Sequence, residues 1–242
     1  MPVPGAASTD FGVMIALSKL RTTKFNADKS VLSIGPGLIW SEVYNFTAQH
    51  GLAVNGGRYG QVGVGGLPIG GGIGYFGKRM GWGANSVVQF EVVLADGTVT
   101  TASSTKNSDL WWALKGGNNN FAIVTRYDMK TIPITQAYEG AVLWQKEAIP
   151  AFFNALYSFL APGGGNEDVD AAINPAVLIT PVNGTFEASN LMMHTNGDPD
   201  PASLRNFTQI TENVIFRDVG LRPWQTLPNL LNTPAFAARE SR

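Results

Sequence analysis

The sequence predicts an α+β protein with two lobes, and three features of the chain lead to that prediction. Glycines recur from Gly63 to Gly83 and are interleaved with apolar side chains rather than polar ones. Two strand-like runs flank the pair Asp96-Gly97, which is typical of a β-hairpin turn. Glycine becomes sparse after about Ala137, where strand-like and helix-like runs fit a second lobe with antiparallel strands.

Composition limits the classes of function. The chain has 242 residues, 44% of them hydrophobic, and a formal net charge of −1 at pH 7. Because nucleic acids and anionic membrane surfaces are bound through clustered Lys and Arg, neither is expected as a partner. No apolar run is long enough to span a bilayer. Cysteine is absent, and no His or carboxylate cluster has ligand spacing, so no metal site is expected.

The first lobe is expected at residues 1–136. Its predicted strands are residues 12–17, 30–34, 52–54, 87–94, 98–102 and 121–130, the fourth and fifth joined by a type I′ turn. A helix capped by Ser41 is predicted to run to about His50 and to end at Gly51. A short helix over residues 109–115 would be capped by Asn107 or Ser108.

The second lobe is expected at residues 137–242. It is predicted to contain a strand at 140–144, a helix at 148–160, and two strand-like runs around 176–180 and 186–194. Asn183-Gly184 between those runs again favours a hairpin. A helix is expected near 202–210, and no closing strand is expected from there to Arg242.

The glycine-rich stretch from Val62 to Val88 is interpreted as a buried loop that a ligand can approach closely. Glycine leaves backbone N–H groups accessible, which suits a phosphate or an extended planar cofactor. For any single glycine, packing or a tight turn is the alternative. Residues 72–77 also match G-x-G-x-x-G, the nicotinamide-type Rossmann turn, although Pro68 and the later glycines do not fit its strand and helix context.

Four motifs follow one another in the first lobe. They are V-G-V-G-G-x-x-x-G-G-G-I-G from Val62, G-W-G-A-N-S-V-V from Gly81, V-V-L-A-D-G from Val92, and N-S-D-L-W-W-A-L-K-G-G-N-N-N-F-A-I-V-T-R-Y from Asn107. Together they resemble the PCMH-type FAD-binding domain of the vanillyl-alcohol-oxidase superfamily, and especially the berberine-bridge-enzyme-like flavoproteins. The resemblance covers about residues 1–135, and the remainder is more loosely similar to the substrate lobe of that family.

The resemblance implies a two-lobed FAD-binding fold followed by part of an antiparallel-sheet substrate lobe. It also implies that the chain is truncated at both ends, with the subdomain that carries a G-G-H flavin-attachment motif upstream of Met1. Residues 1–242 alone are then expected to bind FAD weakly or not at all, because they provide only one wall of the site. They are also expected to turn over no substrate and to aggregate or need a partner.

Cofactor contacts are implied for ten residues. Ala7 and Ser8 end the loop that wraps the pyrophosphate; Val62, Gly63, Gly65 and Gly66 run beside the isoalloxazine and pyrophosphate; Gly70 and Gly74 lie in the same loop; Ile123 and Val124 lend backbone groups to the nucleotide end.

Several positions depart from the pattern of the family. Tyr59 stands where bicovalent relatives have a cysteine bonded to the flavin, so that thioether cannot form. Ile73 replaces a tyrosine that lies near the substrate oxygen in relatives, although Tyr75 is close in sequence. No motif for a general base is matched, so the catalytic residues are unassigned. His194, on a predicted strand, is a candidate acid or base, with a structural role as the alternative.

The resemblance implies an FAD-dependent oxidoreductase that passes a hydride from an alcohol, sugar or secondary-metabolite substrate to flavin N5, with oxygen as the expected acceptor. In plant relatives the residue at Val62 controls oxygen access, and a small β-branched side chain accompanies oxidase behaviour. The alternative is an inactive, flavin-free remnant that acts as a binding or scaffold protein. The expected partners are a small-molecule substrate and oxygen. Three N-x-T sequons, at Asn45, Asn183 and Asn206, favour secretion.

Overall fold

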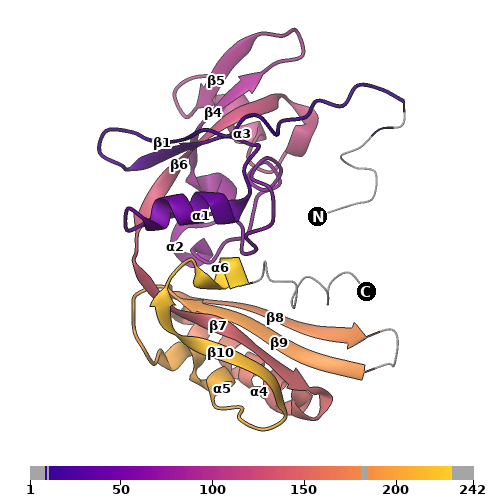
Figure 1. Ribbon diagram of the computed structural model, residues 1–242, viewed down its shortest axis with the longest axis vertical. Helices are drawn as coiled ribbons and strands as arrows, with labels where there is room; N and C mark the ends of the chain where they lie inside the picture. Colours follow the sequence, from indigo (N-terminus) through magenta and orange to yellow (C-terminus); the bar gives the residue numbers. More distant parts are fainter. Residues whose placement is uncertain (1–8, 10, 181–184, 231–242) are drawn as a thin grey trace.

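The computed structural model describes residues 9, 11–180 and 185–230, which form two antiparallel sheets arranged one above the other (Figure 1). The strands are β1 Thr23–Phe25, β2 Val31–Ile34, β3 Leu52–Val54, β4 Val87–Val93, β5 Val99–Ser103, β6 Ile123–Pro133, β7 Gln136–Gln145, β8 Ala171–Thr180, β9 Thr185–His194 and β10 Val214–Pro223. The α-helices are α1 Trp40–Ala48, α2 Gly77–Met80, α3 Ser108–Ala113, α4 Ile149–Leu160, α5 Arg205–Thr208 and α6 Thr226–Leu230. The predicted α+β class is confirmed.

Strand β6 is the centre of the first sheet. The order is β1-β2-β6-β4-β5, and β3 pairs with the far end of β6. Helix α1 buries one face, which carries Trp40, Val43 and Tyr44, as its apolar spacing requires. No described helix is long and apolar enough to cross a bilayer.

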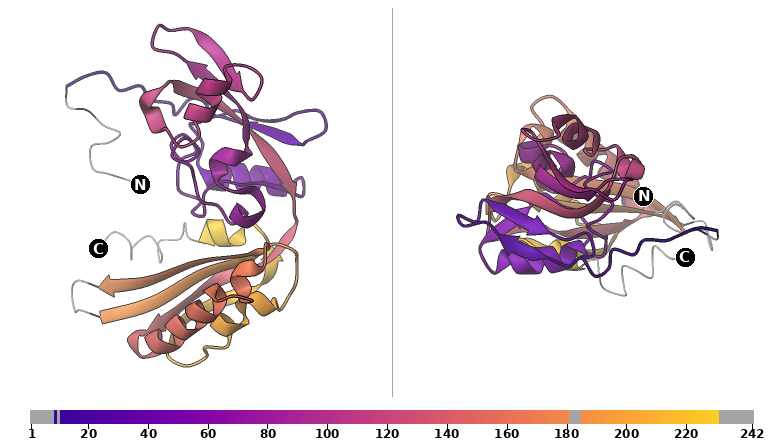
Figure 2. Two further views of the ribbon diagram at one scale, coloured as in Figure 1. Left: turned by 180° about the vertical axis from the view of Figure 1, so that it is seen from behind. Right: turned by 90° about the horizontal axis from the view of Figure 1, so that it is seen from above.

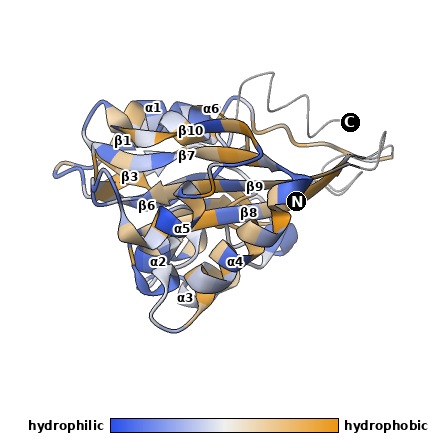
Figure 3. Cartoon of the chain, turned by 90° about the horizontal axis from the view of Figure 1, so that it is seen from below, coloured by the Kyte–Doolittle hydropathy of each residue, from blue (hydrophilic) through white to orange (hydrophobic). Residues whose placement is uncertain are grey.

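The second sheet has the order β10-β7-β9-β8 and is covered on its outer face by α4 and α5 (Figures 1 and 2). Phe152 and Phe159 of α4 pack with Phe207 of α5 in a core that continues onto the strands. In Figure 3 the strands of this sheet carry both hydrophobic and hydrophilic residues. The opposite, inner face lies toward the first lobe, because Ala141 and Leu191 belong to the core of that lobe.

The chain crosses between the lobes twice. It first passes directly from β6, which ends at Pro133, to β7, which begins at Gln136. It then returns through α6, which lies between the two sheets (Figure 2). Trp224 enters the first lobe, with its ring 5.0 Å from that of Tyr44 and 5.8 Å from that of Phe76. The division into residues 1–136 and 137–242 stays a proposal, since α6 packs across it.

Two predicted details of the first lobe are wrong. Residues 12–17 form no strand, because no described segment pairs with them. The hairpin between β4 and β5 is present, but its turn is not type I′, since only Gly97 has positive φ, at 84°. The loop instead has three residues, closed by the N–H of Leu94 donating to the carbonyl of Thr98 at 2.9 Å, and glycine occupies the left-handed position.

The predicted helix caps also need correction. Ser41 lies inside α1 rather than before it, and Oε2 of Glu42 accepts the N–H of Ile39 at 3.0 Å. Asn107 precedes α3, but its side chain makes no cap bond and donates instead to the carbonyl of Thr101 at 2.8 Å. For Asn107, the competing carbonyl of Thr101 decides the role of the side chain.

Strand β10 contradicts the expectation that no strand follows residue 210. It pairs with β7 from Val214 to Pro223, although charged residues interrupt its apolar pattern. Those charges are matched locally, because Arg222 donates to both carboxylate oxygens of Asp218 at 2.7 and 3.0 Å. The predicted turn at Asn183-Gly184 lies outside the described residues.

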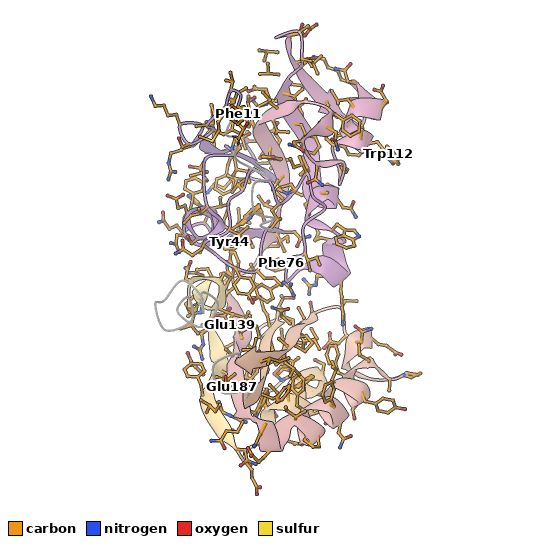
Figure 4. The ribbon with its side chains drawn as sticks, turned by 90° about the vertical axis from the view of Figure 1, so that its right-hand side faces the viewer. Phe11, Tyr44, Phe76, Trp112, Glu139 and Glu187 are labelled. Atoms are coloured by element: carbon orange, nitrogen blue, oxygen red, sulfur yellow. The ribbon has the colours of Figure 1, made fainter. Side chains whose placement is uncertain are left out.

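A buried carboxyl group occupies the junction of the lobes. Glu139 of β7 is 0% exposed, and its Oε1 accepts the N–H of Leu227 in α6 at 2.7 Å. Figure 4 shows Glu139 just below Phe76 and Tyr44, where the two lobes meet. Burial raises the pKa of Glu139 to about 9, because the charged form is poorly solvated there. The group is therefore protonated at neutral pH.

Replacing Glu139 by Gln should stabilise the protein increasingly as the pH rises. The pKa of Glu139 is higher in the folded protein than in the unfolded one. The protonated carboxyl group therefore contributes fully to stability below the unfolded pKa, and this contribution is lost as the pH rises to about 9. Gln keeps an acceptor for Leu227 and cannot ionise. Denaturant titrations across that pH range should show a gap of up to about 1 kcal/mol per pH unit, whereas the exposed Glu147→Gln control should show none. Parallel profiles for Glu139→Gln and the wild type would contradict this assignment.

Candidate cofactor-binding site

Residues 62–66, here called the open strip, form an accessible backbone segment next to α1. The N–H of Trp40 donates to the carbonyl of Val62 at 3.0 Å, and the N–H of Val64 donates to the carbonyl of Leu38 at 2.8 Å. Val64 is fully buried, whereas Val62 is 42% exposed. A Cβ atom added at Gly63 or Gly66 would meet nothing within 4 Å. The strip is thus fixed along one side and open at both glycines.

Gly65 lies between the two open positions and is more enclosed. Its carbonyl accepts the hydroxyl of Tyr127, in β6, at 2.5 Å, and an added Cβ would lie 3.2 Å from the carbonyl oxygen of Pro36. The open strip is therefore attached to the central strand of the first sheet.

The second half of the glycine-rich stretch packs against protein. A Cβ at Gly70 would lie 3.2 Å from the carbonyl oxygen of Gly66, and one at Gly74 would lie 2.3 Å from Oδ1 of Asn55. Gly71 and Gly72 have positive φ angles of 96° and 74°, which side chains disfavour. This half turns the chain and allows close packing, and the cofactor contacts implied for Gly70 and Gly74 remain predictions.

The remaining sequence-predicted contacts lie on β6 or outside the described residues. Ile123 and Val124 pair with Val93 and Val92 of β4. Strand β2 joins β6 only at Tyr127 and beyond, so no described strand covers the other edge of β6 at these two residues. Val124 is 4% exposed as a whole residue, so the backbone contacts implied for these two residues remain predictions. Ala7 and Ser8 lie outside the described residues.

A shallow apolar hollow of about 240 Å³ lies farther along the loop than the open strip. Its lining residues are Gly72, Ile73, Gly74, Gly77, Gly81 and Trp82. Ile73 and Trp82 are 53% and 57% exposed. No described strand leads into residues 72–77, and α2 behind them has four residues. The Rossmann interpretation of this motif is therefore wrong.

Basic residues of α2 contact the second lobe. The ammonium group of Lys78 donates to the carbonyl oxygens of Asn166 at 2.8 Å and Asp168 at 3.1 Å. Arg79 forms an ion pair with Asp170. Sequence analysis missed this contact because α2 was not predicted, and two adjacent basic residues after a glycine run are a weak signal.

His194 belongs to the same contact region. Its ring is buried, and Nε2 lies 2.8 Å from Oδ2 of Asp168. Asp168 thus links the histidine to the lysine of α2, and this arrangement supports a structural role for His194. Within the described residues, no group of His, Asp or Glu side chains could hold a metal ion.

Comparison with known proteins identifies relatives for most of the chain. Residues 2–103 match the family described as FAD binding domain. The chain is 46% identical to the FAD-dependent monooxygenase prx3 of Penicillium roqueforti over 211 residues, 87% of this chain and 41% of that protein. It is 39% identical to the bifunctional solanapyrone synthase of Alternaria solani over 176 residues, 73% of this chain and 34% of that protein. The chain thus spans less than half the length of these curated relatives.

Solved structures share the fold. The structure of 6-hydroxy-D-nicotine oxidase from Arthrobacter nicotinovorans matches with a TM-score of 0.78 at 19% identity, covering 93% of this chain and 49% of that one. A variant of berberine bridge enzyme matches with a TM-score of 0.70 at 17% identity, covering 90% of this chain and 44% of that one. Because the sequence identity is low in both cases, these two matches show a shared fold and nothing more.

Replacing Lys78 by Met should loosen the contact between α2 and the second lobe. Methionine keeps the apolar stem of Lys78 but leaves carbonyl oxygens around residues 165–168 without their donor. The free energy of unfolding should fall by about 1 kcal/mol, because the site is partly exposed. Urea unfolding and limited proteolysis measure the effect, with the exposed Lys24→Met as control. Equal stability and equal cleavage in both variants would show that the contact has no energetic role.

Proposed function

We propose that the chain, like the relatives it matches, is part of an FAD-linked oxidoreductase with a PCMH-type FAD-binding domain, and that it takes part in oxidation of a small-molecule substrate by hydride transfer to FAD. When bound, FAD supplies the two-electron acceptor. The residues of this chain supply position and electrostatics. Because the chain spans less than half of its curated relatives, the activity of the whole protein is part of this proposal.

The openness of Gly63 and Gly66 is the observation that carries the proposal. Space beside both Cα atoms lets a flat ring system or a phosphate approach the main chain directly. The edge of β6 at Ile123 and Val124, which no described strand pairs on that side, is a second place proposed for polar contacts with the nucleotide end. These residues fit FAD, and they would hold it without any side chain reacting.

The inner face of the second sheet is proposed to contact the substrate. Its strands β7, β9 and β8 lie opposite the first lobe (Figure 1), and its side chains include the apolar Leu143 and Leu191 and the polar Asn174. An apolar surface with few polar groups suits a compact organic molecule. Secondary metabolites fit this surface better than sugars, and relatives named as synthases or monooxygenases support that choice.

Oxygen is proposed as the electron acceptor. The support comes from Val62, which is small and 42% exposed on the open strip, so it leaves room for oxygen beside the implied flavin. Secretion remains a further proposal, supported only by the exposed positions of Asn45 and Asn206 in two sequons.

Replacing Gly66 by Leu should abolish FAD binding and leave the fold intact. No neighbouring atom would clash with the new Cβ, so the side chain would fill only the space proposed for the cofactor. We expect the dissociation constant for FAD, measured by quenching of flavin fluorescence, to rise about 100-fold or more, since a leucine would displace a close backbone contact. Circular dichroism checks the fold.

Gly77→Leu is the matched control, because Gly77 is equally open but lies outside the strip. It should bind FAD as the wild type does. If Gly66→Leu also keeps wild-type affinity, the open strip is not the cofactor site. If a protein that joins this chain to the upstream part of a curated relative takes up no FAD at any concentration, the flavin-free binding protein is the better explanation.

Enlarging Val62 should slow the reaction of the reduced protein with oxygen. In the FAD-loaded chain, Val62→Leu fills exposed space on the open strip, and we expect reoxidation in air to become about 10-fold slower because access narrows. Stopped-flow absorbance measures the rate, and Val99→Leu on the exposed end of β5 is the control. Identical rates in the three proteins would count against oxygen reaching the flavin past Val62.

A further inference from the structure

Arg58 lies at the junction of the two lobes, in the turn between β3 and the open strip. Its Nη1 donates to Oδ1 of Asn174, in β8, at 2.7 Å, and Nδ2 of Asn174 lies 3.3 Å from the hydroxyl of Tyr59. Asn174 is registered with Leu191 of β9, whose side chain is on the inner face. The guanidinium group is therefore held between the first lobe and the inner face of the second sheet.

The charge of Arg58 has no carboxylate partner among the described residues. Five of the other described arginines pair with carboxylates: Arg21 with Glu42, Arg79 with Asp170, Arg126 with Glu91 and Asp128, Arg205 with Asp200, and Arg222 with Asp218. Arg217 also bonds only to neutral oxygens, those of Thr208 and Ile210, but it is exposed to solvent. Arg58 is half-buried. A half-buried cation without a counter-ion is unfavourable unless an anion joins it.

The hydroxyl of Tyr75 is a second unsatisfied donor in this neighbourhood. Tyr75 is 6% exposed, and its oxygen has no hydrogen-bond partner among the described residues. Burial raises the pKa of Tyr75 far above its ordinary value, and the positive charge of Arg58 partly opposes that rise. The phenol therefore keeps its proton. Tyr75 directly follows Gly74, whose backbone packs on that of Gly56, two residues before Arg58. The hydroxyl of Tyr75 and the N–H groups of Arg58 that Asn174 does not use are donors without an acceptor among the described residues.

We propose that Arg58 and Tyr75 anchor a planar oxyanion of the substrate, such as a carboxylate or the enolate of a 1,3-dicarbonyl compound. The planar fork of Arg matches two coplanar oxygens, and its remaining N–H groups are available after the bond to Asn174. This inference rests on the proposed function, because it takes the inner face of the second sheet as the surface that contacts the substrate. The competing role is structural, with Arg58 serving only to connect the lobes through Asn174.

Binding of small anions to the full chain separates these two roles. Benzoate and the enolate of dimedone are the probes, benzamide is the neutral control, and isothermal titration gives each dissociation constant. Arg58→Met should weaken both anions about 10-fold or more, and Arg58→Lys should weaken them less, because it keeps the charge but loses the fork. Tyr75→Phe should weaken them several-fold, and benzamide should not compete.

Lys78→Met is the decisive variant. It removes a different contact between the lobes, the bonds from Lys78 to the carbonyl oxygens of Asn166 and Asp168, and leaves Arg58 and Asn174 untouched, so anion affinity should stay within about 3-fold of the wild type. If Lys78→Met loses as much affinity as Arg58→Met, or if benzoate binds the wild type and Arg58→Met equally, the anchor does not exist. Absence of benzoate binding to the wild type would also overturn it. Thermal unfolding of each variant shows whether the fold is kept.

FAD uptake is measured separately on the same proteins, so the two proposals can fail independently. Arg58→Met should take up FAD as the wild type does, because Arg58 lies outside the open strip. A chain that binds benzoate through Arg58 but takes up no FAD would contradict the proposed function and leave the anchor standing. A chain that binds FAD but no benzoate would contradict only the anchor.

Discussion

Close stacking of backbone on the ring of Trp40 is the constraint on which the rest of the site depends. A Cβ atom at Gly56 would lie 2.2 Å from a carbon of this ring, and one at Gly74 would lie 2.5 Å from the carbonyl oxygen of Gly56. Real Cβ atoms never approach so closely, so two layers of main chain can lie over the indole only because both residues are glycine. The indole in turn is fixed because α1 buries it completely.

This stacking explains the positions of the groups that follow along the chain. Gly56 is followed two residues later by Arg58, and Gly74 is followed directly by Tyr75, so both proposed donors adjoin glycines of the same stack. The backbone N–H of Trp40 also donates to the carbonyl of Val62, which fixes the start of the open strip. Through its ring and its backbone, Trp40 thereby contacts the segments that carry the proposed cofactor contacts and the proposed anion contacts.

Sequence patterns located the regular parts of the fold and missed the parts decided by distant partners. Strand β3 has the predicted bounds, and the hairpin of β4 and β5 is present because short-range turn chemistry determines it. Strand β10 was missed because its stability comes from pairing with β7, about 80 residues away, which no local pattern reports. The position of Arg58 between the lobes likewise could not be predicted from the sequence, because it depends on the contact with Asn174 of β8. A single arginine in a turn usually faces solvent.

The lobe junction contains more unsatisfied polar groups than a purely structural interface would need. Apolar packing by Trp224 already joins the lobes, and replacing buried polar groups by apolar ones usually costs little or stabilises. Yet Glu139 keeps one carboxyl oxygen without a partner among the described residues, and Tyr75 keeps a bare hydroxyl there. Such groups are retained where something besides stability depends on them. Burial raises the pKa of Glu139 to about 9, so this carboxyl group is neutral at physiological pH and adds no negative charge to the junction.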